Sequence, residues 1–142
     1  MSFVRVWIHV VFTTKNREAI LSSELRQRLC EHIRQNASMK GIFLDSINGW
    51  SEHLHLLISL GREQNIANVA MLLKGESSHW FNQQKFVRGN LYWQDDYFAL
   101  SVSESLVGRV RAYIRNQEIH HTAKPFSEEY DAFRRIVEDG LG

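Results

Sequence analysis

The stretch IFLDSINGWSEHLHLLISL, residues 42–60, decides the fold, because it contains two strand patterns in immediate succession. Side chains on a strand point alternately to opposite faces of a sheet. Within residues 52–60 every second residue is apolar, which gives one unbroken row of Leu54, Leu56, Ile58 and Leu60. His53 and His55 project together from the opposite face. Residues 42–49 predict the partner strand of 52–60, and Asn48-Gly49-Trp50 predicts the turn between the two.

The elements around this hairpin alternate between strand and helix patterns. In chain order they are a strand at 3–13, a helix at 22–39 capped by Ser22 or Ser23, a helix at about 65–84, a short strand within 91–102, a helix at about 103–122 and a short terminal helix at 127–138. The resulting order is β-α-β-β-α-β-α. It predicts an α+β, ferredoxin-like fold, an antiparallel sheet with helices on one face, plus an added C-terminal helix.

Length and composition indicate a single soluble domain spanning residues 1–142. The net charge is +1, but the tail 127–142 holds five acidic and two basic residues, so the remainder carries an excess of four positive charges. That excess permits a phosphate-binding surface without requiring one. Cys30 is the single cysteine, which excludes a disulfide within the chain. We see no signal peptide and no apolar run near the ~20 residues of a membrane span, so we expect a cytoplasmic protein.

His53 and His55 are candidate metal ligands. Two imidazoles at positions i and i+2 of a strand lie close enough to share one ion, and imidazole is the commonest nitrogen ligand of metals in proteins. The alternative is a pair of half-exposed histidines on an ordinary sheet face. From this segment alone the two interpretations are equally supported.

The segment VRAYIRNQEIHH, residues 110–121, contains the second candidate group. Tyr113 and Gln117 are four residues apart, so on a helix one lies above the other. A phenol is a weak nucleophile unless neighbouring groups stabilise the phenolate. Arginines that could hold phosphates and lower the tyrosine pKa are Arg109, Arg111 and Arg115. Alternatively, Tyr113 packs at the edge of the apolar stripe formed by Leu106, Val110 and Ile114, and Gln117 is solvated.

The order of these segments resembles that of the single-tyrosine HUH transposases, the IS200-like enzymes of insertion sequences that move as single strands. The matching motifs run along nearly the whole chain: VVFTTKNR at 10–17, GWSEHLHLLISL at 49–60, LLKGESSHWF at 72–81, YWQDDYFALSVSES at 92–105 and YIRNQEIHH at 113–121. Two positions depart from the family pattern. Glu52 precedes the histidine pair where aspartate is more usual, and Asp96 stands where glycine is usual.

The resemblance implies that His53, His55 and Gln117 bind a divalent cation and that Tyr113 attacks the DNA. Two imidazoles alone would favour zinc, because Mg²⁺ prefers oxygen ligands, but the family precedent is Mg²⁺ or Mn²⁺. The expected reaction cuts single-stranded DNA at hairpin-bearing element ends through a 5′-phosphotyrosine. The resemblance also implies a homodimer in which one subunit's tyrosine helix completes its partner's metal site. Weaker candidates for DNA contacts are Lys15, Arg17, Lys74, Arg109 and Arg115.

Three residues and two further functions stay open at this stage. His9 has no assigned role, and His120 and His121 are as compatible with a structural role at a helix end as with a DNA contact. One alternative function is a repeat-associated tyrosine transposase that cuts hairpins with no mobile element around it. The other is a non-catalytic module that binds structured nucleic acid, which would not need a metal site at His53 and His55.

Overall fold

The structure is a computed structural model, and it describes residues 2–117 and residue 135. The predicted terminal helix at 127–138 and the acidic tail 127–142 therefore lie outside the described residues, apart from residue 135. The same holds for His120, His121 and the last part of the predicted helix at 103–122.

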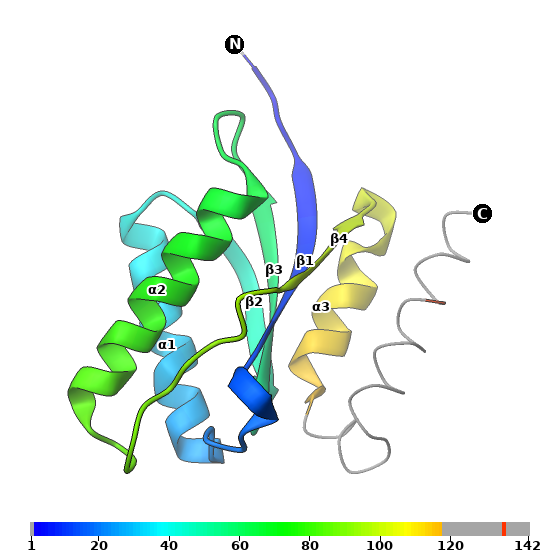
Figure 1. Cartoon of the computed structure of the whole chain (residues 1–142). Helices are drawn as coiled ribbons and strands as arrows, with labels where there is room; N and C mark the ends of the chain where they lie inside the picture. The colour runs from blue at the N-terminus through cyan, green and yellow to red at the C-terminus, as the bar shows by residue number, and fades with distance from the viewer. Residues whose placement is uncertain (1, 118–134, 136–142) are drawn as a thin grey trace.

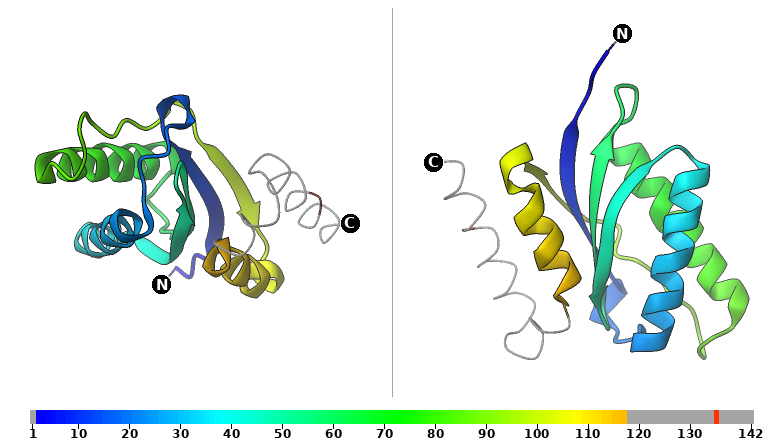
Figure 2. Two further views of the ribbon diagram at one scale, coloured as in Figure 1. Left: turned by 90° about the horizontal axis from the view of Figure 1, so that it is seen from below. Right: turned by 180° about the vertical axis from the view of Figure 1, so that it is seen from behind.

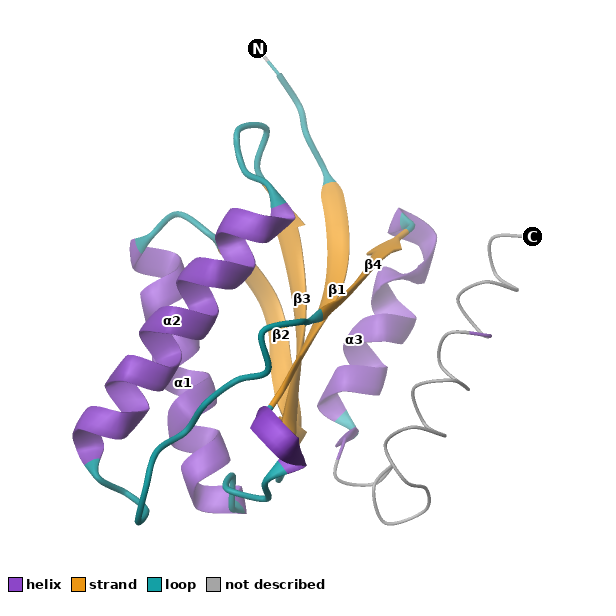
Figure 3. Ribbon diagram, viewed as in Figure 1, coloured by secondary structure: helices purple, strands orange, loops and turns teal. Residues whose placement is uncertain are grey.

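The described chain forms a four-stranded sheet with three α-helices (Figures 1 and 3). The elements are β1 (Val6–Thr13), the 3-10 helix η1 (Lys15–Arg17), α1 (Ser23–Met39), β2 (Phe43–Trp50), β3 (His53–Leu60), α2 (Ile66–Gln84), β4 (Phe98–Val102), the 3-10 helix η2 (Glu104–Leu106) and α3 (Val107–Arg115). The strand order is β2-β3-β1-β4, and each neighbouring pair is antiparallel. This arrangement confirms the predicted α+β, ferredoxin-like fold.

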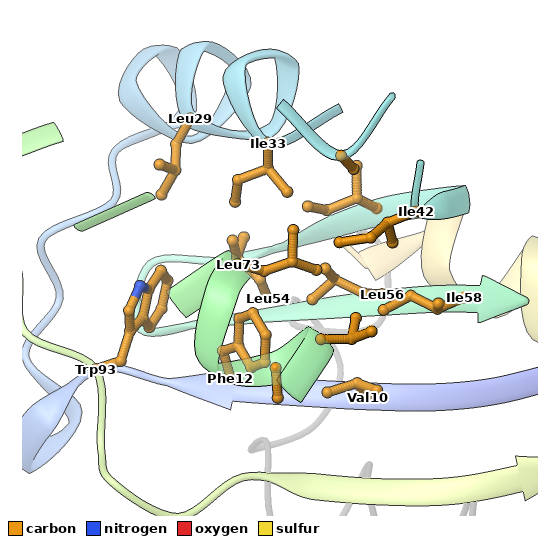
Figure 4. Close-up of a cluster of buried hydrophobic side chains, with 14 of the residues drawn as sticks. Val10, Phe12, Leu29, Ile33, Ile42, Leu54, Leu56, Ile58, Leu73 and Trp93 are labelled. Carbon is orange, nitrogen blue, oxygen red and sulfur yellow. The ribbon is translucent and has the colours of Figure 1, made fainter. Parts of the chain in front are cut away.

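The sheet separates two apolar cores. Helices α1 and α2 cover one face, while α3 lies over the other (Figure 2). The larger core packs the apolar row of β3 and the inward side chains of β1 against α1 and α2; Figure 4 labels Val10, Phe12, Leu29, Ile33, Leu54, Leu56 and Leu73 within it. The smaller core lies beneath α3 and comprises Trp7, Leu57, Val102, Leu106, Val107, Val110 and Ile114. The added helix thus covers the sheet face that also carries the histidine pair.

Local sequence signals account for the starts of both long helices. The Ser22 hydroxyl accepts a hydrogen bond from the Leu25 amide at 3.4 Å, which satisfies a backbone donor that the helix itself leaves open. Asn65 does the same for the Asn68 amide at 2.9 Å at the start of α2. Gly41, just after α1, has φ +70°, a conformation that glycine adopts without a side-chain clash.

The predicted turn at Asn48-Gly49-Trp50 is wrong. All three residues belong to β2 and pair with His55, Leu54 and His53, and the chain turns at Ser51 and Glu52 instead. Gly49 is needed for close approach rather than for a turn, because a Cβ atom there would lie 2.0 Å from the carbonyl oxygen of His53.

Two predicted boundaries also move inward. The N-terminal strand begins at Val6 rather than at residue 3, since residues 3–5 have no partner strand to pair with among the described residues. The α-helical part of the predicted helix at 103–122 begins at Val107, after a 3-10 turn at 104–106; α3 ends at Arg115, and residues 118–122 of the prediction lie outside the described residues. Among the described residues, no helix is both long and apolar enough to cross a membrane.

Candidate active site

His53 and His55 lie at the centre of the sheet, on the face covered by α3. Strand β3 has β2 on one side and β1 on the other, so both imidazoles are enclosed laterally, and neither residue is exposed to solvent (0%). The interpretation of these residues as half-exposed surface histidines is therefore wrong. Burial of polar rings is costly unless they are hydrogen-bonded, and both imidazoles have polar contacts.

Each histidine has its Nδ1 atom engaged by a neighbouring polar group. The Nδ1 of His53 lies 2.8 Å from Oε1 of Glu52, whose other oxygen accepts a hydrogen bond from the Ser51 hydroxyl at 2.7 Å. The Nδ1 of His55 lies 2.9 Å from Nε2 of His9, a buried residue of β1. An imidazole that donates from Nδ1 presents an electron pair at Nε2, which is how carboxylates and other acceptors orient metal-binding histidines.

Gln117 joins the pair from beyond the end of α3. Its Oε1 lies 3.2 Å from Nε2 of His53, and the residue is fully buried. Its amide nitrogen donates to the backbone carbonyl of Tyr113 at 3.3 Å, which turns the oxygen toward the histidine. The alternative of a solvated glutamine is excluded, and a turn at Asn116 separates the end of α3 at Arg115 from Gln117.

Tyr113 is partly buried beside the histidines. The ring of Tyr113 meets that of His55 edge to face, with centroids 5.5 Å apart and an interplanar angle of 84°. The His9 ring is in a similar relation, at 6.3 Å and 77°. One chain therefore brings the phenol, two imidazoles and an amide together at a single place on the sheet.

These donors fit a divalent cation. Ligands at adjacent positions around an octahedral ion with bonds of ~2.1 Å are separated by roughly 3 Å, close to the 3.2 Å between His53 Nε2 and Gln117 Oε1. Three neutral donors would leave room for phosphate oxygens on the same ion. Among the described residues, no group of three His, Cys, Asp or Glu side chains is arranged to hold a metal, so a site here depends on the amide of Gln117.

The three arginines of α3 have different environments. The guanidinium of Arg111 makes a two-pronged salt bridge with Asp45, with both N–O distances 2.8 Å. This contact holds the pKa of the Asp45 carboxyl below its usual value and raises that of Arg111. Arg109 is exposed, and Arg115 lines a cavity of about 540 Å³ together with Arg26 and Arg34 of α1. Arg111 thus fastens α3 to β2, which sets it apart from the other two.

The candidate DNA contacts outside α3 also differ from one another. The Lys74 ammonium donates to the backbone carbonyls of Gln94 and, at 2.8 Å, Asp95, and partial burial lowers its pKa. Lys74 therefore fastens α2 to the loop that precedes β4. Lys15 and Arg17 are exposed, and Arg17 lines a second cavity, of about 260 Å³, beside β1 and β4.

His9 and Glu52 contact the site, and the sequence alone did not assign them a role there. Burial lowers the pKa of His9 to about 3, so its ring is neutral at physiological pH and can accept a hydrogen bond from His55. Strand alternation places His9 on the same face as Trp7 and Val11. However, its approach to His55 depends on the register of β1 against β3, which alternation within one strand does not specify.

The chain is similar to known transposases. A family model described as "Transposase IS200 like" matches residues 2–117. The ISDra2 transposase TnpA of Deinococcus radiodurans is 29% identical over 115 residues, which cover 77% of this chain and 81% of that protein. A crystal structure assigned to a transposase of Deinococcus radiodurans R1 shares 26% identity and a TM-score of 0.64, and the match covers 82% of this chain and 93% of that one. The structure of a REP-associated tyrosine transposase bound to a REP hairpin has a similar fold, with a TM-score of 0.58 at 14% identity over 85% of this chain and 72% of that one.

Proposed function

Because the chain belongs to the IS200-like transposase family, we propose that it cleaves and rejoins single-stranded DNA at hairpin-bearing element ends, with Tyr113 as the nucleophile. The position of Tyr113 against His55 is the observation that carries this proposal. A transposase that acts through a tyrosine needs its phenol next to groups that bind the scissile phosphate. The edge-to-face contact of the two rings brings the phenol of Tyr113 to the groups best suited to that task, the histidine pair and Gln117.

In the proposed reaction the phenol oxygen of Tyr113 attacks the scissile phosphorus in line. A bond forms between that oxygen and phosphorus, and the bond from phosphorus to the 3′ oxygen breaks. The phenol loses its proton and the departing 3′ oxygen gains one, so the products are a 5′-phosphotyrosine and a free 3′-hydroxyl. Attack by the 3′-hydroxyl of another strand reverses these changes and releases Tyr113, which requires no ATP because the phosphodiester bond energy is retained.

We further propose that His53, His55 and Gln117 hold Mg²⁺ or Mn²⁺. Such an ion neutralises charge on the non-bridging phosphate oxygens when it is bound. The contacts of Glu52 and His9 fix the two rings with their Nε2 atoms available, and the hydrogen bond from Gln117 to the Tyr113 carbonyl couples the amide ligand to the nucleophile. This contact holds the proposed amide ligand against the backbone of the residue that carries the nucleophile.

Hairpin recognition and dimerisation extend the proposal. The REP-associated tyrosine transposase of similar fold is bound to a REP hairpin, and the shared fold supports a hairpin substrate for this chain as well. The described chain places Tyr113 at its own histidines, so a site shared between subunits would require α3 to exchange between two copies. A mixture of Tyr113→Phe and His53→Ala chains tests this point. If the site is shared, both defects fall in one active site of a mixed dimer and the other site is intact, so activity returns; if each chain builds its own site, both sites are defective and activity stays absent.

Adduct formation on hairpin-bearing single-stranded DNA tests the main proposal. With Mn²⁺ present, wild-type protein should form a covalent complex that survives denaturing electrophoresis, and Tyr113→Phe should bind the same DNA without forming it. Tyr92→Phe is the matched control, since it also removes one phenol oxygen, in this case from a residue that is 57% exposed. An adduct that persists in Tyr113→Phe would refute the nucleophile. Failure of wild-type protein to bind Mn²⁺ in calorimetry would favour a non-catalytic nucleic-acid-binding module.

A further inference from the structure

A second cavity lies on the sheet face that carries the histidine pair. Its volume is about 260 Å³, and its lining includes Val11 and Thr13 of β1, Phe98 of β4, and Arg17, Asp96 and Tyr97 from the adjoining loops. In the register of β1 against β3, Val11 pairs with His55 and Thr13 with His53. Directly paired residues point to the same face, so the floor of the cavity lies one strand spacing, about 4.8 Å, from the histidine pair.

The lining combines aromatic surface with a carboxylate. Phe98 is 48% exposed, a large fraction for an aromatic residue on a sheet, and it supplies the aromatic surface, because the partly buried ring of Tyr97 packs against the larger core on the opposite face. Asp96 is exposed at the same cavity. A carboxylate repels a phosphate but accepts hydrogen bonds from the amino groups of bases. At Asp96 the lining therefore favours a base over a phosphate. Arg17, which lines the same cavity, supplies a positive charge for a phosphate of the adjoining DNA backbone.

The size of the cavity limits its occupant. Sites for drug-sized ligands begin at ~300 Å³, so a cavity of about 260 Å³ suits a group no larger than one base. A base in a duplex is stacked and paired on both sides and cannot enter, whereas the bases of a single strand can stack on exposed aromatic rings. The position beside the histidines matches a nucleotide close to the phosphate that is cut.

We infer that this cavity binds one unpaired base of the DNA strand next to the scissile phosphate, stacked against Phe98, with Asp96 accepting a hydrogen bond from its exocyclic amino group. The inference rests on the proposed function, because it takes the histidine pair and Tyr113 to mark the scissile phosphate. Adenine, cytosine and guanine carry an exocyclic amino group, and thymine does not. Asp96 therefore makes the enzyme discriminate against thymine at one position of its target.

The test uses a pool of oligonucleotides in which a hairpin is flanked by randomised single-stranded segments. Covalent adducts are captured with Mn²⁺ present, and the attached strands are sequenced for wild-type protein, Asp96→Asn and Asp95→Asn. Asp95 is the matched control, because it is the neighbouring residue, undergoes the same loss of charge and is not part of the cavity lining. Phe98→Leu removes the aromatic ring while keeping an apolar side chain.

Wild-type protein and Asp95→Asn should disfavour thymine at one and the same flanking position, by roughly 5- to 150-fold. Asp96→Asn should change the base preference at that position alone, and Phe98→Leu should lower capture of all four bases there by roughly 5-fold or more. A profile identical in wild type and Asp96→Asn would overturn the inference and leave the proposed function intact. A pool from which wild-type protein captures no adduct would overturn the proposed function, and this inference with it.

Discussion

Replacement of His9 by leucine should weaken metal binding without touching a proposed ligand. The Nε2 atom of His9 lies 2.9 Å from Nδ1 of His55, and the two residues are 1% and 0% exposed. Burial lowers the pKa of His9 to about 3, so at neutral pH its ring is uncharged and can accept a hydrogen bond from Nδ1 of His55. His55 then presents the electron pair of Nε2 to a metal. Leucine cannot accept this hydrogen bond, and His55 loses the contact that selects this tautomer.

The expected size of the effect follows from the environment of this contact. Loss of an outer hydrogen-bond partner of a metal-binding histidine weakens metal binding about 10- to 100-fold, or roughly 1.4–2.8 kcal/mol. A buried donor left without its acceptor also lowers the free energy of unfolding by about 1–3 kcal/mol. Titration calorimetry with Mn²⁺ measures the first effect, and urea unfolding without metal measures the second.

Ser77→Ala controls for the loss of stability. The Ser77 hydroxyl accepts a hydrogen bond from Trp93 Nε1 at 3.1 Å, also in a buried position but on the sheet face covered by α1 and α2. This variant also leaves a buried donor without its acceptor, so it should lose about 1–3 kcal/mol of stability and keep the wild-type affinity for Mn²⁺. Wild-type Mn²⁺ affinity in His9→Leu, or an equal loss of affinity in Ser77→Ala, would refute the positioning role of His9.

Three further outcomes are expected from other parts of the fold. Gly49→Ala should destabilise the protein by about 3 kcal/mol or more in urea unfolding, because its Cβ would lie 2.0 Å from the His53 carbonyl oxygen; wild-type stability would show that β2 can shift freely. Asp45→Asn should slightly lower the free energy of unfolding at pH 7 through the loss of the solvent-screened Arg111 salt bridge. Arg111 lowers the pKa of Asp45 in the folded protein. The difference in stability between wild type and variant should therefore be complete above the ordinary carboxyl pKa and disappear as the pH falls through the lowered pKa of Asp45. A difference that persists in strong acid would show that the salt bridge is not its cause. Partial burial raises the pKa of the Cys30 thiol to about 12, so it should react slowly with an aromatic disulfide reagent at pH 8 in folded protein and rapidly in urea, and equal rates would contradict the raised pKa.

The sequence predicts the fold well where local patterns determine it. Alternation in β3 correctly separates the apolar row from His53 and His55, because strand geometry has a period of two residues. Ser22, one of the two predicted capping residues, marks where α1 begins, since its side chain replaces a missing backbone hydrogen bond. The apolar stripe containing Val110 and Ile114 likewise predicts that α3 is amphipathic and packs against the sheet.

Features that depend on contacts between distant segments were not predictable in this way. Asn48-Gly49 has the composition of a turn, but the reason for Gly49 is the close approach of the next strand, which only the assembled sheet reveals. The contact of His9 with His55 likewise depends on the register of β1 against β3, which is seen only in the assembled sheet. The sequence predicts that Lys74 is a surface cation, whereas in the structure its ammonium donates hydrogen bonds to the backbone carbonyls of the loop before β4. The proposed roles of Tyr113 and Gln117 came from family resemblance, and their position beside the histidines supports those roles.

The identity of the residue that becomes joined to DNA is the most direct test of the account. Wild-type protein should be reacted with hairpin-bearing single-stranded DNA in Mn²⁺, digested with nuclease and protease, and analysed by tandem mass spectrometry. A peptide containing Tyr113 should carry the mass of a 5′-linked nucleotide on its phenol oxygen. A nucleotide found instead on another residue, such as Tyr92 or Tyr97 in the loop before β4, would contradict the account.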